Sequence, residues 1–293
     1  MLTDTLQTYK KVVDDQLTKL LKTPNKEYAC LYKAMEYSLL AGGKRIRPIL
    51  TMLTLDSLHV DWHPYLDLIC SLEVIHTYSL IHDDLPAMDN DDYRRGRLTN
   101  HKVYGDGMAT LAGDGLLTYA FECITDNRAA KNEQKLSCIE ILAKAAGPAG
   151  MVGGQAYDLH SEGQTLSLKE LQVLHAGKTG ALFLAAIHMG TILGKASSKI
   201  KDAYISYAKA LGLLFQITDD MLDVTGTMEE LGKMPGSDEK EHKATYTSIF
   251  GLEGAKAYAC ETAEKAKQSL DGLEAVDTSQ LVALIEYLLH RSA

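Results

Sequence analysis

The residues best suited to chemistry are five aspartates that follow an apolar segment. They are Asp83, Asp84, Asp89, Asp91 and Asp92, with Pro86 among them. Like charges this close raise one another's pKa or require a cation. Several carboxylates without cysteine suit a hard, oxygen-binding ion such as Mg²⁺. The alternative is a solvated acidic helix end, which is the usual state of a charge run.

A second acidic cluster, Asp219, Asp220 and Asp223, follows the apolar run Leu211–Ile217. Asp219 and Asp223 are four residues apart and share one helix face at about 6 Å, where they would repel each other without a cation. Two aspartate-rich helix ends in one chain favour two walls of a single site for several metal ions.

Basic residues indicate what such a site receives. Arg94 and Arg95 directly follow the first cluster, and the distant segment 42–48 carries Lys44 and Arg47. A guanidinium group binds phosphate with two hydrogen bonds, and a Mg²⁺ held by few carboxylates keeps positions for phosphate oxygens. Two basic loops therefore predict two anionic substrates. The alternative for Lys44 and Arg47 is that they are ordinary surface charges.

The segment Gly177-Lys178-Thr179 resembles the end of a nucleotide-binding P-loop, but Gln172 stands where that motif requires glycine. A nucleotide kinase is therefore excluded. Glycines at 177 and 180 within a helical pattern each cost about 1 kcal/mol relative to alanine, so we expect a kink that exposes backbone carbonyls and the Thr179 hydroxyl. The alternative is a close helix contact that glycine permits.

Helices must position these residues, because 3.6-residue periodicity recurs along the chain. Apolar positions from Leu66 to Ser79 follow this spacing, as do those from Leu171 to Met189, and Ser167 with Glu170 forms a capping box. We expect non-helical segments at 22–26, 89–107, 160–166 and 226–243. The sequence predicts an all-α fold of about ten helices.

Composition predicts one domain. The chain has 293 residues, 46% hydrophobic and 24% charged, with six prolines, and it has no linker or repeat, so we expect a single domain over 1–293. A net charge of −9 argues against nucleic-acid binding.

The same composition predicts a cytoplasmic protein. Five scattered cysteines indicate reduced, mostly buried thiols. The N-terminus does not resemble a signal peptide, and the apolar stretch 181–193 is too short to cross a bilayer. We therefore expect no stable membrane insertion.

Taken together, these motifs resemble those of the trans-isoprenyl diphosphate synthases. The resemblance rests on the two aspartate motifs, on Arg94-Arg95-Gly96, and on further matches along nearly the whole chain: 42–48, His76, Gly113-Asp114, Gly153-Gly154-Gln155, Lys178-Thr179, Phe215-Gln216 and Lys233 to Lys243. It is strongest to the bacterial farnesyl diphosphate synthases, whose first motif carries the same insertion containing proline.

The resemblance implies a fold, partners and roles. The fold would be an isoprenoid-synthase-type helical bundle around a central active-site cavity, usually in a homodimer. About three Mg²⁺, with Mn²⁺ as a substitute, would be held by Asp83, Asp84, Asp89, Asp219, Asp220 and Asp223. Arg94, Lys178, Gln216, Lys233 and Lys243 would contact the allylic diphosphate, and Lys44, Arg47, His76 and Arg95 would bind isopentenyl diphosphate. Lys178, Thr179 and Gln216 would stabilise an allylic carbocation.

The implied reaction condenses isopentenyl diphosphate with dimethylallyl and then geranyl diphosphate to give farnesyl diphosphate. Tyr78 lies five residues before Asp83, about 7.5 Å along a helix, where an aromatic ring would stop elongation at C15. The alternative is that Tyr78 is simply a packed ring. Leu98 and Ser237 depart from the family pattern, in which proline and lysine are frequent.

Other functions fit the motifs less well. A geranylgeranyl diphosphate synthase needs only a deeper pocket, whereas a terpene cyclase rarely carries the second basic loop. A metal-dependent phosphohydrolase using His82-Asp83 leaves the second aspartate motif unexplained, and a non-catalytic regulatory subunit leaves both intact motifs unused.

Overall fold

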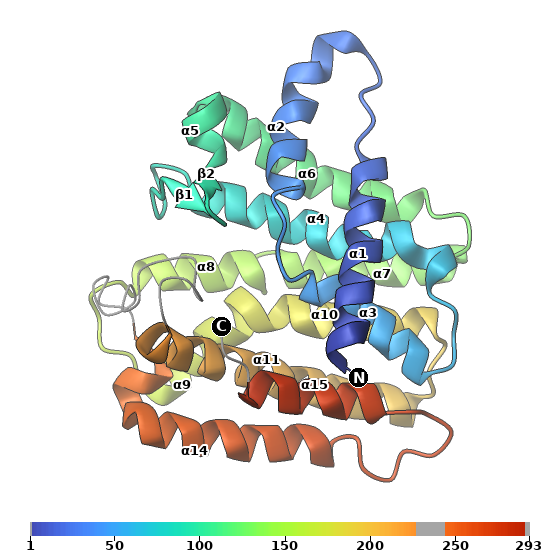
Figure 1. Cartoon of the computed structure of the whole chain (residues 1–293), viewed down its shortest axis with the longest axis vertical. Coiled ribbons are helices and arrows are strands. Elements are labelled where there is room, and N and C mark those ends of the chain that lie inside the picture. The colour runs from blue at the N-terminus through green and yellow to red at the C-terminus, as the bar shows by residue number, and fades with distance from the viewer. Residues whose placement is uncertain (1, 227–243, 291–293) are drawn as a thin grey trace. The chain divides into compact units, whose positions relative to one another are not determined.

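The computed structural model describes residues 2–226 and 244–290, and helices make up most of them (Figure 1). The helices in chain order are α1 (Leu2–Leu20), η1 (Lys26–Tyr28), α2 (Ala29–Leu39), α3 (Ile46–Ser57), η2 (His63–Tyr65), α4 (Leu66–Asp83), α5 (Asn100–Tyr104), α6 (Asp106–Thr125), α7 (Asn132–Ala146), α8 (Met151–His160), α9 (Leu168–His175), η3 (Ala176–Gly180), α10 (Ala181–Leu193), α11 (Ser198–Thr225), α14 (Tyr246–Gln268) and α15 (Ser279–His290). The predicted all-α fold is confirmed.

The chain forms two compact units. Unit 1 comprises Met1–Met52 and Asp61–Ile139, and unit 2 comprises Leu53–Val60 and Glu140–Ala293. The chain passes from unit 1 to unit 2 within α3, returns to unit 1 between Val60 and Asp61, and passes to unit 2 again within α7. The first aspartate motif and both basic loops belong to unit 1, whereas the second aspartate motif belongs to unit 2.

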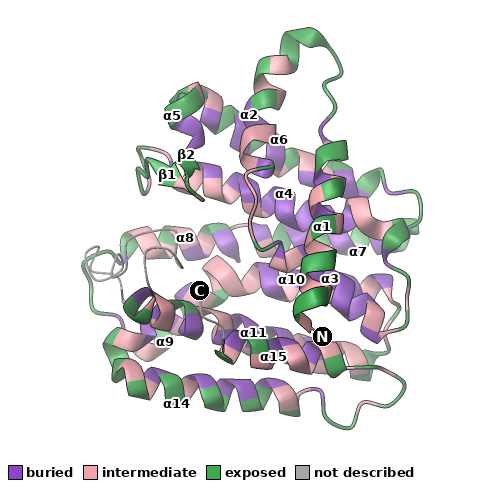
Figure 2. Ribbon diagram, in the orientation of Figure 1, coloured by how far each residue is buried: buried purple, intermediate pink, exposed green. Residues whose placement is uncertain are grey.

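The core of unit 1 is built around α4, which packs along α6. Every residue of α4 from Leu68 to Ile75 is buried, including Glu73, and Figure 2 shows this as a nearly continuous buried stretch. A helix that is apolar on all sides is a core helix. The predicted periodic segment is therefore confirmed, with burial on every face of its middle rather than along one stripe.

One predicted loop is wrong in part. Within 89–107 the structure forms the helix α5 and a hairpin of β1 (Tyr93–Arg94) and β2 (Arg97–Leu98), antiparallel with Arg94 opposite Arg97. The buried Asn100 amide nitrogen donates to the Ala34 carbonyl at 2.7 Å and to the Ser38 hydroxyl at 2.8 Å. These contacts with α2 hold a helix too short for periodicity to reveal.

Unit 2 packs α11 against α10 and α14. Tyr204 and Tyr207 on α11 are completely buried, and each hydroxyl has a partner: Tyr204 pairs with the Ser57 hydroxyl at 2.8 Å, and Tyr207 donates to the Leu281 carbonyl at 2.9 Å. A buried tyrosine adds apolar area to the core, and a hydrogen bond to its hydroxyl offsets the cost of desolvating that group.

The segment α9–η3–α10 begins as predicted. Ser167 and Glu170 form the expected capping box, and residues 161–167 before it are non-helical. Within the described residues, Leu168–Leu193 is one helical run long and apolar enough to cross a membrane by length and composition, and half of its most apolar window is buried inside the protein. The apolar stretch 181–193, expected to be too short to cross a bilayer, is α10, but η3 joins it to α9 and so makes it part of this longer run.

The cysteines lie largely where the composition predicted. Cys70, Cys123 and Cys138 are buried, Cys30 and Cys260 are exposed, and all five are free thiols. Burial raises the pKa of Cys123 and of Cys138 to about 12, so these thiols remain protonated and act as small apolar side chains.

Candidate active site

The first aspartate motif is folded into one turn at the end of α4. Asp83 is the last residue of the helix and Asp84 caps it. The loop then returns, because the Asp89 amide donates to the Asp83 carbonyl at 2.9 Å and the Asn90 amide donates to the Leu85 carbonyl at 3.1 Å. The four residues between Asp84 and Asp89 thus form a closed turn that keeps all three aspartates at the helix end.

Arg94 faces this turn. Its guanidinium donates from Nε at 2.7 Å and lies at 2.6 Å through Nη2 from the same Asp84 oxygen, Oδ1. Burial raises the pKa of Asp84 above its ordinary value; Arg94 opposes this shift, while Asp91 and Asp89 add to it. The turn therefore carries more negative charge than Arg94 offsets, which suits an additional cation with oxygen ligands.

Arg95 turns to a different partner. Its Nη1 donates to the Gly42 carbonyl, and a Cβ added to Gly43 would lie 2.7 Å from the Arg95 Cζ. Gly43 also has φ +124°, a conformation that side chains rarely adopt. The two basic loops predicted from sequence are thus in contact within unit 1. Of the two neighbouring arginines, Arg94 binds the acidic turn and Arg95 binds the glycine loop.

A cationic cluster surrounds the glycine loop. Burial lowers the pKa of Arg47 to about 10, which Glu73 opposes and Arg95 reinforces. Burial also lowers the pKa of His76 well below its ordinary value, and the charges of Arg47 and Arg95 add to this effect. His76 is therefore neutral near pH 7. Cations that depress one another's pKa are stabilised by an anion placed between them, and Lys44 lies exposed on the same loop.

Sequence reasoning missed two buried residues beside this cluster. Arg45 is 2% exposed and Glu73 is 2% exposed, and the Arg45 Nη1 donates to the Glu73 Oε1 at 2.7 Å. The available signal was a lone carboxylate within the apolar run of α4, since such a residue is rarely buried without a partner.

Tyr78 lies below the acidic turn on α4. It is 5% exposed, and its ring meets the His82 ring edge-on with centroids 5.7 Å apart. The His82 Nε2 is 3.0 Å from the Thr110 carbonyl, and a Cβ on Gly113 would lie 2.1 Å from that nitrogen. Gly113 of α6 therefore makes room for His82, which in turn covers Tyr78.

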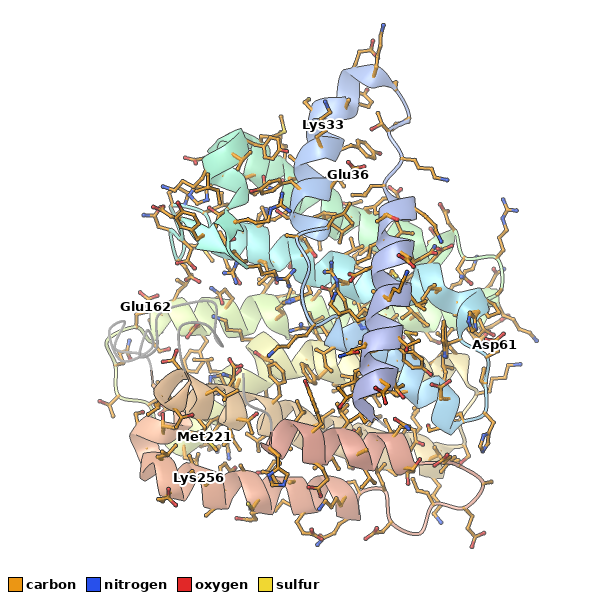
Figure 3. All side chains as sticks on the ribbon, viewed as in Figure 1. Lys33, Glu36, Asp61, Glu162, Met221 and Lys256 are labelled. Carbon is orange, nitrogen blue, oxygen red and sulfur yellow. The ribbon has the colours of Figure 1, made fainter. Side chains whose placement is uncertain are left out.

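In unit 2, the second aspartate motif lies near the end of α11. Asp220 and Asp223 are buried at 3% and 4% exposure, whereas Asp219 is exposed. Met221, labelled in Figure 3, marks this turn of the helix. Two of the three aspartates are therefore buried.

A chain of hydrogen bonds links this motif to the kinked segment. The Thr179 hydroxyl donates to the Gln216 Oε1 at 3.2 Å, the Gln216 Nε2 donates to the Asp220 Oδ1 at 2.9 Å, and the Asp220 Oδ2 accepts from the Tyr246 amide at 2.8 Å. Both ends of the Gln216 amide are engaged, which fixes its oxygen on the side of Thr179. The N-terminus of α14 is tied to the same carboxylate.

The kink itself is a π-helical turn, η3, that contains Gly177, Lys178 and Thr179. A Cβ on Gly154 of α8 would lie 2.1 Å from the Lys178 amide nitrogen, so the backbones of α8 and η3 are in direct contact. The close helix contact that glycine permits is therefore present, and the helix is irregular at the expected glycines. The Lys178 Nζ donates to the Asp158 carboxylate of α8. Such π-turns occur often at functional sites.

The contacts of the candidate residues place most of them in three groups. Unit 1 gathers Asp83, Asp84, Asp89 and Arg94 in one group and Arg47, His76 and Arg95 in another; unit 2 gathers Lys178, Thr179, Gln216 and Asp220. Lys233 and Lys243 lie outside the described residues. In the part of the chain that the structure describes, no three His, Cys, Asp or Glu side chains already form a metal cluster.

The sequence matches a known protein family over most of its length. The family model for polyprenyl synthetase matches residues 28–282. The chain belongs to the polyprenyl synthetase family. This match covers residues of both units and includes both aspartate motifs.

Two similar members of the polyprenyl synthetase family are farnesyl diphosphate synthases. The enzyme of Geobacillus stearothermophilus is 49% identical over 268 residues, which cover 90% of this chain and 89% of that protein. The enzyme of Micrococcus luteus is 49% identical over 263 residues, covering 89% of each chain. The crystal structure of a farnesyl/geranylfarnesyl diphosphate synthase from Zymomonas mobilis superposes with a TM-score of 0.86, with 35% identity and 98% of both chains covered.

Proposed function

We propose that this protein is a farnesyl diphosphate synthase. It condenses isopentenyl diphosphate with dimethylallyl diphosphate and then with geranyl diphosphate, giving (2E,6E)-farnesyl diphosphate. The observation that carries the proposal is the 49% identity over about nine-tenths of the chain with two enzymes of that name. A geranylgeranyl diphosphate synthase is less well supported, and the family match leaves the phosphohydrolase and terpene cyclase alternatives without support. A non-catalytic subunit does not account for the intact motifs.

The metal in this proposal is Mg²⁺, about three ions, with Mn²⁺ as a substitute. The excess negative charge around the desolvated Asp84 supports a cation there, and the oxygen-only donors suit a hard ion. Asp83, Asp84 and Asp89 of unit 1 and the set Asp219, Asp220 and Asp223 of unit 2 would hold the ions. When bound, Mg²⁺ supplies positive charge that offsets the charge of the allylic diphosphate.

The protein's cations divide between the two substrates. Arg94, beside the aspartates, would bind the allylic diphosphate together with Lys178, Gln216, Lys233 and Lys243. Lys44, Arg47, His76 and Arg95 would bind the diphosphate of isopentenyl diphosphate. The different partners of Arg94 and Arg95 support this division, because the Arg94 guanidinium binds Asp84 of the acidic turn and the Arg95 guanidinium binds the Gly42 carbonyl of the glycine loop.

Other residues stabilise the carbocation that forms when the allylic C–O bond breaks. The Thr179 hydroxyl, the Lys178 carbonyl and the Gln216 oxygen present dipoles without a nucleophile that would trap the cation. The hydrogen bond from Gln216 to Asp220 supports this role because it fixes which end of the amide points to Thr179. The isopentenyl double bond attacks C1, and the released diphosphate accepts the proton lost afterwards.

Product length, assembly and location complete the proposal. Tyr78 forms the floor that stops elongation at C15, and its burial beneath His82 supports a fixed position for the ring. The chain acts as one polyprenyl synthetase domain over 1–293, as a homodimer in the cytoplasm. The family match across residues of both units supports a single functional domain.

Steady-state kinetics of two variants test the division of substrates. Arg94→Gln is expected to raise KM for geranyl diphosphate, and Arg95→Gln to raise KM for isopentenyl diphosphate, each about tenfold, since each loses one charged contact. Initial rates of transfer from labelled isopentenyl diphosphate measure both constants. A parent protein that transfers nothing contradicts the function, whereas two variants that raise the same KM contradict only the division.

A further inference from the structure

Arg45 is a buried cation that three helices hold. Its Nε donates to the Asp14 Oδ1 of α1 at 2.8 Å, its Nη1 to the Glu73 Oε1 of α4 at 2.7 Å, and its Nη2 to the Leu39 carbonyl of α2 at 2.9 Å. Only 1% of the side chain is exposed, so this guanidinium is not available to a substrate. Its backbone has φ +53°, which is uncommon for a residue with a side chain.

Glu73 is the carboxylate that Arg45 holds. It is 2% exposed and lies on α4 one turn before His76, so the two share a helix face. Its negative charge also acts on two other arginines, because it raises the pKa of Arg47 and of Arg95 against the effect of burial. Glu73 is therefore a potential internal partner for the cations assigned to isopentenyl diphosphate.

Without Arg45, this carboxylate would compete with the substrate. A buried carboxylate that loses its partner is strongly destabilised and binds the nearest available cation. Arg47 lies two residues after Arg45, in the first turn of α3, and Arg95 donates to the Gly42 carbonyl of the loop before it. Either guanidinium, once drawn to Glu73, would have fewer donors for a diphosphate.

We propose that Arg45 is a positioning residue that holds the Glu73 carboxylate and so keeps this carboxylate from drawing the guanidinium groups of Arg47 and Arg95 away from the diphosphate of isopentenyl diphosphate. This inference rests on the proposed function. Asp14 has a lesser part, because its side chain is 31% exposed and also pairs with Lys10 at 2.6 Å. The Arg45–Glu73 pair thus fixes the position of the Glu73 charge and does not contact the substrate.

The test compares one single and one double variant by steady-state kinetics. Arg45→Gln is expected to raise KM for isopentenyl diphosphate about tenfold or more, with kcat and KM for geranyl diphosphate changed by less than about threefold. Arg45→Gln combined with Glu73→Gln removes the competing charge, so KM for isopentenyl diphosphate is expected to return to within about threefold of the parent value. Arg97→Gln, an exposed arginine on β2, is the control and should change neither KM.

The double variant also guards against a folding defect. It also removes the carboxylate that Arg45→Gln leaves without its partner, so we expect it to fold even if Arg45→Gln does not, and thermal unfolding of each variant checks this. A double variant with KM for isopentenyl diphosphate still raised tenfold would overturn the inference, as would an Arg45→Gln protein that folds with an unchanged KM. A parent protein that transfers no prenyl group would instead overturn the proposed function.

Discussion

Arg94 directs two nitrogens to a single oxygen of Asp84: Nε at 2.7 Å and Nη2 at 2.6 Å from Oδ1. Both residues are partly or fully buried, and the pair closes the turn that follows α4. Even so, burial raises the pKa of Asp84 above its ordinary value. The turn is therefore stable as a folded element and still short of positive charge, which is what a site for a cation and a diphosphate requires.

Replacing Asp84 tests this turn. Asp84→Asn keeps the size of the side chain but removes its charge, so we expect the Mg²⁺ concentration for half-maximal activity to rise and kcat to fall, each by about ten- to a hundredfold. Activity measured against Mg²⁺ concentration provides both values. Asp91→Asn, whose exposed carboxylate is 3.7 Å from Arg94, is the matched control; if both variants behave alike, Asp84 has no special role.

Replacing Tyr78 tests the proposed floor. Tyr78→Ala removes a ring that is 95% buried against His82, and we expect the main product to lengthen from C15 to C20 or beyond. Tyr78→Phe keeps the ring and should keep the C15 product. Chromatography of the dephosphorylated alcohols distinguishes these outcomes, and an unchanged C15 product from Tyr78→Ala would show that the floor lies elsewhere.

The contact between α8 and η3 predicts a difference between two glycines. In Gly154→Ala the new Cβ would lie 2.1 Å from the Lys178 amide nitrogen, and we expect a loss of about 2 kcal/mol in the free energy of unfolding, because backbone must move. In Gly107→Ala, also helical, nothing lies within 4 Å, and a gain of roughly 0.5 kcal/mol is expected. Urea unfolding measures both, and equal values would contradict the close contact.

Stability should fall as the pH is lowered, in part because of His175. Burial lowers the pKa of His175 to about 4, which Asp158 opposes and Lys178 reinforces. Between its ordinary pKa of 6.5 and about 4, the unfolded chain takes up a proton that the folded protein refuses, so the contribution is full above 6.5 and is lost toward 4.

The measurement is the free energy of unfolding at several pH values. We expect His175→Gln to reduce the loss between pH 6.5 and 4 by up to about 3 kcal/mol. His76, whose pKa is also lowered by burial, should account for part of the slope that remains. His160→Gln, on the surface, is the control and should leave the parent slope in place; an unchanged slope in His175→Gln would contradict the account.

The sequence predicts the helices well wherever the chain has long apolar runs. The run 181–193 is α10 with those bounds, and the capping box at Ser167 opens α9. Clusters of charged residues were equally informative, because aspartates or arginines at that density need counter-ions. The hydrogen bond from Arg94 to Asp84 is one such pairing.

What the sequence could not reveal depends on contacts between distant segments. The π-turn at Gly177 lies against Gly154 of α8, a contact that no local pattern encodes. The helix α5 depends on Asn100 bonding to α2. The sequence could not reveal the role proposed for Arg45 for the same reason. In the sequence, an arginine that binds a buried glutamate looks the same as an arginine that binds phosphate, and Glu73 lies on a different helix.

The most direct test of the central claim is the product itself. The purified protein would be incubated with radiolabelled isopentenyl diphosphate and either dimethylallyl or geranyl diphosphate, with and without Mg²⁺, and the dephosphorylated products separated by chromatography. We predict a C15 alcohol that forms only in the presence of Mg²⁺. Absence of any elongated product, with either allylic substrate, would contradict the assignment as a farnesyl diphosphate synthase.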